Sequence, residues 1–93
     1  MFATYSIAKI ASEVVARTAC RQFGVPTTVA RLNVPYGDDL GWPWFHLKMM
    51  EAGMAVPVHP DRPNRFNPIH VDDIVRQVPR LLAVASVPAT VVN

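Results

Sequence analysis

The chain has 93 residues, of which 51% are hydrophobic and 17% charged, and its formal net charge is +2. A typical soluble domain has about 25% charged residues, so this composition is that of a core-forming piece. A chain this short nevertheless buries only about 60–65% of its surface. Its Lys and Arg residues are too scattered for the basic stripe that nucleic-acid binding requires, and nucleic acid is not an expected partner.

The cysteine content and the hydropathy of the sequence indicate the cellular compartment to expect. The single cysteine, Cys20, cannot form an internal disulfide, and neither a charged-then-apolar leader nor an apolar run of about 18 residues is recognisable. We therefore expect a reducing, cytoplasmic setting without a membrane partner. The three histidines, His46, His59 and His70, lack metal-ligand spacing, and no metal site is expected.

The first predicted element is a helix from Tyr5 to Phe23. Apolar or small residues recur in it at the spacing of an amphipathic helix. They are Ile7, Ile10, Ala11, Val14, Val15, Thr18 and Ala19. Gly24 is a natural left-handed stop, and Pro26 cannot continue the helix. Lys9 and Glu13 stand four residues apart and are expected to pair.

Tyr5 and Lys9 are the first candidate site. Residues four apart share a helix face, with Cβ atoms about 5–6 Å apart, so the ammonium can lie beside the phenol and favour the phenolate. Such a tyrosine can give or take a proton at a carbinol or carbonyl oxygen while hydride moves at the adjacent carbon. The alternative is an exposed helix start with a solvated lysine, because this spacing also arises by chance.

A short strand is predicted at Thr27–Leu32, followed by a loop rich in turn-forming residues at Asn33–Asp39. In open α/β sheets, ligands bind in the loops beyond the carboxyl ends of strands, so this loop is the second candidate site. Trp42–Ala52 is predicted to be a helix with Pro43 in its first turn and Gly53 at its end. That helix lacks a clean polar face, which favours core packing over a ligand site.

Four prolines between Ala55 and Pro68 permit only short extended pieces and turns. Ile69–Val71 is predicted to be extended, and Asp72 or Asp73 is positioned to cap the helix that follows.

The apolar stripe of this last helix runs from Ile74 to Ala85 and is interrupted by Pro79. A proline there predicts a kink that leaves the Val75 carbonyl without its usual partner. Pro88 closes the region, and Ala89–Val92 is predicted to be a strand.

Three segments together resemble successive signatures of one family. They are Tyr5–Lys9 with Glu13 behind it, Ala30–Gly37, and Pro68–Ile74. In order and separation they are similar to the NAD-dependent epimerase/dehydratase family, the extended branch of the short-chain dehydrogenases/reductases. The resemblance covers nearly the whole chain.

The resemblance implies a role for several residues. Tyr5 resembles the catalytic acid/base, and Lys9 resembles the lysine that activates it and binds the nicotinamide ribose, so both would contact NAD or NADP. Leu32, Asn33 and Val34 resemble the loop that passes the nicotinamide and the substrate.

Two candidate substrate contacts depart from the family's register. Asn33 stands two residues after Arg31, whereas the family usually has its asparagine three residues after the arginine. Arg65 resembles an arginine that grips substrate phosphate, but it lies one residue off that position, and a solvated surface arginine is the alternative.

The family resemblance implies an α/β fold, namely the C-terminal part of a Rossmann-like, doubly wound parallel sheet with part of a small substrate-binding region. Residues 1–93 would be one partial domain: 1–41 the active-site helix, strand and loop, 42–68 the substrate-region segment, and 69–93 the return to the core. The family's glycine-rich turn and catalytic serine or threonine have no counterpart in this sequence, so a fragment is expected.

The expected function is that of an epimerase, dehydratase or reductase acting on a hydroxyl or keto group, with nucleotide sugars as the leading substrate class. A homodimer, or a missing N-terminal half, would complete it. The alternative is a non-catalytic truncated or assembly subunit that needs a partner chain.

Overall fold

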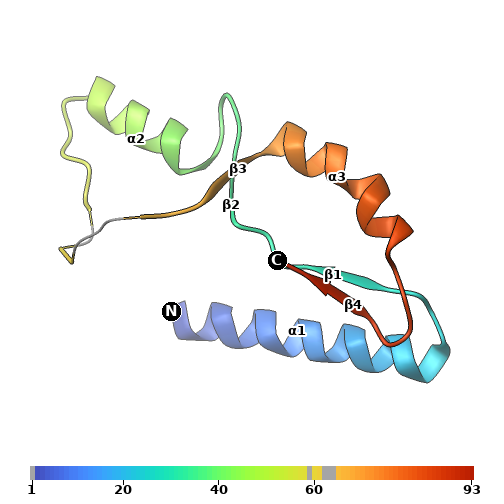
Figure 1. The fold of residues 1–93 in the computed structure, drawn as a ribbon. Coiled ribbons are helices and arrows are strands. Elements are labelled where there is room, and N and C mark those ends of the chain that lie inside the picture. Colours follow the sequence, from blue (N-terminus) through green and yellow to red (C-terminus); the bar gives the residue numbers. More distant parts are fainter. Residues whose placement is uncertain (1, 59, 62–64) are drawn as a thin grey trace. The chain divides into compact units, whose positions relative to one another are not determined.

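The computed structural model describes residues 2–58, 60–61 and 65–93 (Figure 1). In chain order the elements are α1 (Phe2–Phe23), β1 (Thr28–Ala30), β2 (Val34–Tyr36), α2 (Gly41–Glu51), β3 (Pro68–His70), α3 (Val71–Ala83) and β4 (Thr90–Val92). The predicted mixture of helices and parallel strands is confirmed. Among the described helices, none combines the length and apolar character needed to cross a membrane.

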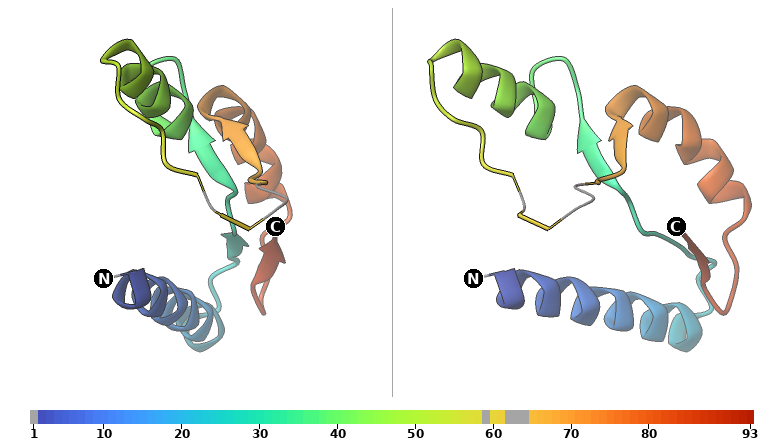
Figure 2. Two further views of the ribbon diagram at one scale, coloured as in Figure 1. Left: turned by 90° about the vertical axis from the view of Figure 1, so that its left-hand side faces the viewer. Right: turned by 60° about the vertical axis from the view of Figure 1, so that its left-hand side comes forward.

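The strands form two separate parallel pairs (Figure 2). Strand β1 pairs with β4, with Thr28 opposite Thr90, and β2 pairs with β3, with Val34 opposite Pro68. The chain is therefore α/β in the broad sense, and a continuous Rossmann-like sheet stays a prediction.

The chain divides into two compact units. The terminal unit is Met1–Arg31 with Val78–Asn93, and the middle unit is Leu32–Gln77. Helix α3 begins in the middle unit and ends in the terminal unit.

Two glycines end helices where the sequence predicts. Gly24 has φ +64° after α1, and Gly53 has φ +71° after α2. The Val25 N–H donates to the Cys20 carbonyl at 3.2 Å, and the Met54 N–H donates to the Met49 carbonyl at 2.8 Å. Both bonds close the Schellman motif, in which a left-handed residue allows the chain to turn back onto orphan carbonyls.

The strand predictions need correction. The loop predicted at Asn33–Asp39 contains strand β2, and the strand predicted at Thr27–Leu32 is only Thr28–Ala30. Pro35 lies inside β2, which pairs with β3 alone among the described strands. A strand with one unpaired edge tolerates a proline because the missing N–H faces away from the partner.

The predicted cap of α3 is also wrong. Helix α3 begins at Val71, so Asp72 and Asp73 both lie in its first turn, where their charges favour the helix dipole. The residue before the helix is His70, and its Nδ1 accepts the backbone N–H of Asp72 at 3.1 Å. An imidazole thus occupies the capping role. Pro79 lies inside α3, and the kink expected there stays a prediction.

Threonine hydroxyls fix the other end of α3 within the terminal unit. Thr28 Oγ1 donates to the Leu81 carbonyl at 2.6 Å, and Thr90 Oγ1 donates to the Val84 carbonyl at 2.7 Å. These two carbonyls stand where a helix end leaves acceptors without intrahelical partners. Because the two threonines face each other across β1 and β4, one strand pair holds the helix end from both strands.

Few side chains are fully buried. Of the described residues, only Cys20 is buried, at 2% exposure. On α1, Ile7, Ile10 and Val15 are 65–68% exposed. Each residue from Ala3 to Ser12 is exposed. The described contacts therefore leave the N-terminal half of this helix uncovered.

Replacement of Gly41 tests how α2 is attached to β2. Gly41 has φ +87°, and a Cβ there would lie 2.8 Å from the Pro35 carbonyl oxygen and 2.9 Å from the Tyr36 Cα. Gly41→Ala should speed amide hydrogen exchange throughout β2 and the first turn of α2. An alanine disfavours the positive φ, and its Cβ would be too close to the backbone of β2, so the close approach of α2 to β2 is lost.

Gly24→Ala is the matched control. Gly24 is also left-handed, but a Cβ there meets nothing within 4 Å, so only the conformational cost of about 1–2 kcal/mol applies. Equal local destabilisation by the two substitutions would contradict the tight contact inferred at Gly41.

Candidate functional site

Helix α1 brings the predicted acid/base pair together. The Lys9 Nζ lies 5.9 Å from the centroid of the Tyr5 ring, near the outer limit of a cation–π contact. The Tyr5 residue is 66% exposed, so its ring is open to a substrate. One helical turn thus places the ammonium near the Tyr5 ring, and its predicted position beside the hydroxyl stays a prediction.

Glu13 anchors this helix to the end of β1. Its carboxylate accepts two hydrogen bonds from Arg31, at 2.6 Å from Nη2 and 3.2 Å from Nε. The Arg31 guanidinium holds the pKa of Glu13 below its ordinary value, and the same contact raises the pKa of Arg31. Arg17 lies 3.7 Å from the same carboxylate.

The expected Lys9–Glu13 pair is therefore wrong. Within the described part of the chain, the ion pairs of Glu13 are with Arg31 and Arg17. A bidentate guanidinium matches a carboxylate better than an ammonium does, and Lys9 is left beside Tyr5.

The remaining predicted site residues belong to the middle unit. Leu32 is 54% exposed. Asn33 and Arg65 are exposed, while Val34 is half-buried as the first residue of β2. Tyr5 and Lys9 belong to the terminal unit.

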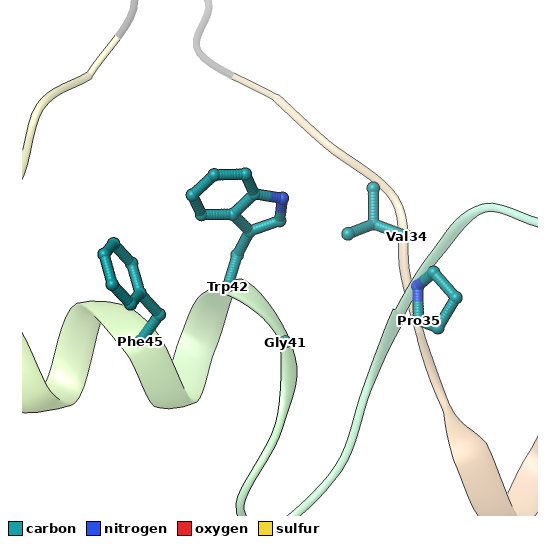
Figure 3. Close-up of a pocket in the computed structure, with 5 residues that line it drawn as sticks. All are labelled: Val34, Pro35, Gly41, Trp42 and Phe45. Atoms are coloured by element: carbon teal, nitrogen blue, oxygen red, sulfur yellow. The ribbon is translucent and has the colours of Figure 1, made fainter. Parts of the chain in front are cut away.

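Val34 borders an apolar hollow in the middle unit (Figure 3). Pro35 lies beside it on β2, and the start of α2 adds Gly41, Trp42 and Phe45. The hollow has a volume of about 440 Å³ and is largely open to solvent. Figure 3 shows the Trp42 and Phe45 rings on the same side of α2, and their centroids are 5.9 Å apart at 79°.

Trp42 and Phe45 were not predicted as site residues. The helix prediction assigned them to core packing, yet they are 56% and 47% exposed. The available sequence signal was a glycine, Gly41, between a turn-rich segment and an aromatic run. In the structure this glycine has a positive φ, and it brings the start of α2 against β2.

No group of three or more His, Cys, Asp or Glu residues that could hold a metal ion is found where the structure describes the chain. His59, one of the three histidines considered in the sequence, lies outside the described residues.

No protein-family model matches the chain, and no curated protein matches it.

The Glu13–Arg31 contact gives a pH prediction. The pKa of Glu13 is lowered in the folded protein from a reference of 4.5, so its stabilising effect is complete above that value and is lost as the pH falls through the lowered pKa. Glu13→Gln should modestly destabilise the protein near pH 7, and this loss should shrink progressively as the pH falls below 4.5, as measured by urea denaturation.

Glu51→Gln serves as the control. Glu51 pairs with Lys48 at 2.8 Å inside α2, and such an exposed i,i+3 pair contributes little to stability. A loss of stability in Glu13→Gln that does not shrink as the pH is lowered from 7 through 4.5 and below would show that the carboxylate's charge is not responsible.

Proposed function

We propose that this chain carries the proton-transfer pair of an NAD(P)-dependent epimerase, dehydratase or reductase that acts on a hydroxyl or keto group. Nucleotide sugars are the leading substrate class. The observation that supports this function is the placement of the Lys9 ammonium 5.9 Å from the exposed Tyr5 ring on α1. The family resemblance of the three sequence segments adds to it.

Each residue of the pair has a distinct task. The Tyr5 hydroxyl passes a proton to or from the substrate oxygen, and the Lys9 charge stabilises the phenolate that forms when the proton leaves. The bound nicotinamide cofactor supplies or accepts the hydride. Glu13 and Arg31 act at a distance from the reacting atoms by fixing α1 against β1.

The middle unit offers surfaces that suit the cofactor and the substrate. The apolar hollow beside Val34 is compatible with a flat, uncharged ring such as nicotinamide. Leu32 and Asn33 are exposed just before it and would contact the same group. Arg65 is exposed and free to meet a substrate phosphate, which a guanidinium binds well.

The complete enzyme needs further protein. The family's glycine-rich turn for the pyrophosphate has no counterpart in this sequence, so other protein would hold the adenine end of NAD or NADP. The two parallel strand pairs support a place in a larger Rossmann-like sheet. A cytoplasmic setting suits the single unpaired cysteine.

The test is turnover of the protein isolated together with whatever completes it. Tyr5→Phe should lower kcat by about 10²-fold or more while cofactor binding changes little, because only the acid/base group is removed. Lys9→Met should weaken both cofactor binding and kcat. NADH fluorescence measures cofactor binding, and steady-state kinetics measures kcat.

Tyr36→Phe provides the matched control, since it removes a phenol hydroxyl from β2 and should leave kcat near wild type. Preserved turnover in Tyr5→Phe would rule out the assignment of Tyr5. A Lys9→Met protein with unchanged cofactor affinity and pH profile would rule out the role of Lys9.

A second candidate function is that of a non-catalytic subunit that assembles with another polypeptide. The observation that favours it is the burial of Cys20 alone among the described residues, with Ile7, Ile10 and Val15 open to water. Apolar surface of this extent marks an interaction site in a soluble protein. Either a second copy of this chain or a different chain could cover this apolar surface.

The isolated 93-residue chain should therefore associate. Its apparent mass in gel filtration should rise over about a hundredfold range of protein concentration, because association follows mass action. A monomer of 10.3 kDa that stays unchanged over this range and melts cooperatively would refute the need for a partner.

A further inference from the structure

His70 contacts three parts of the middle unit with one half-buried ring. The ring makes a T-shaped contact with Tyr36, its register partner on β2, with ring centroids 5.1 Å apart at 87°. Its Nε2 lies 3.5 Å from the Asp38 carboxylate in the segment between β2 and α2. Its Nδ1 accepts the Asp72 N–H at 3.1 Å at the start of α3.

These contacts define a protonation state. A ring nitrogen accepts a hydrogen bond only when it carries no proton, so Nδ1 is bare while the cap is formed. The proton of the neutral ring then sits on Nε2, where it faces the Asp38 carboxylate. The hydrogen-bond pattern thus assigns a neutral Nε2–H imidazole.

A second proton would change the partner of Nδ1. The protonated nitrogen can no longer accept the Asp72 N–H, and a positive charge at a helix N-terminus opposes the helix dipole. The Asp72 carboxylate lies 3.7 Å from the same Nδ1 and can accept its proton. The Asp38 carboxylate lies on the other side of the ring, 3.5 Å from Nε2.

The other charged groups near the start of α3 have partners of their own. Asp73, also in the first turn of α3, pairs with Arg76 at 2.9 Å, and the Arg76 Nε donates to the Asp72 carbonyl at 3.3 Å. Tyr36, Asp38 and Asp72 are the titratable residues whose described contacts are with the ring itself.

We propose that His70 is a pH-dependent link between the start of α3 and the segment that joins β2 to α2. The neutral ring caps α3 through the Asp72 N–H. The protonated ring pairs with the carboxylates of Asp72 and Asp38, which leaves the first turn of α3 uncapped and strengthens the contact to the segment beside the apolar hollow. This link does not depend on the function proposed above.

Amide hydrogen exchange at Asp72 tests the proposal in the protein as isolated. Exchange is followed between about pH 8 and pH 5, the interval in which imidazoles ordinarily gain a proton, with correction for intrinsic exchange rates. The wild-type protection factor should fall about fivefold, as expected for the loss of one N-cap. His70→Asn should keep its protection across the range, because an asparagine caps a helix without titrating.

His70→Ala should show low protection at both ends of the range. Three results would overturn the proposal: equal protection of wild type and His70→Ala near pH 8, an unprotected Asp72 amide in wild type at that pH, or the same pH dependence in His70→Asn as in wild type. The first two would show that the cap is absent, and the third that another group titrates.

Discussion

Helices and strands in a domain of this size hold together mainly through apolar side chains that leave water. In this chain Cys20 is the only described residue that is fully buried, although half of the sequence is hydrophobic. Its Sγ lies 3.5 Å from the Ser86 carbonyl, so even the buried contact joins α1 to the segment before β4 through a weak donor. The remaining order comes from polar groups: helix caps, hydroxyls on helix-end carbonyls and the Glu13–Arg31 pair. Such contacts fix geometry, and each adds little free energy in water.

The features that the sequence predicts well are those decided within a few residues. Gly24 and Gly53 end helices because a left-handed residue there closes a local hydrogen-bond pattern. Tyr5 and Lys9 meet because one helical turn separates them. In each case residues within a few positions along the chain determine the local geometry, so the prediction does not require knowledge of a distant partner.

The features that the sequence missed depend on distant partners. Strand β2 forms in a turn-rich segment because Pro68–His70 pairs with it, more than 30 residues away along the chain. Arg31 displaces Lys9 as the partner of Glu13 because β1 brings it to α1 across 18 residues of sequence. His70 displaces the aspartates as the cap of α3 because β3 runs directly into the helix, which places the imidazole at its first N–H groups.

The position of Tyr5 along α1 links the missing core to function. The described anchors of this helix, Glu13 and Cys20, lie in its second half, whereas residues 3–12 are all exposed. Proton transfer requires the acid/base group to be held within a fraction of an ångström of the reacting oxygen, in a site from which water is excluded. A tyrosine on the uncovered half of a helix satisfies neither condition. Ile7 and Ile10 lie about 140–200° around α1 from Tyr5, because an α-helix turns about 100° per residue. A partner that covers the apolar side chains of α1 would therefore not by itself enclose Tyr5 and Lys9, and the proposed proton transfer requires protein on that other face of the helix as well.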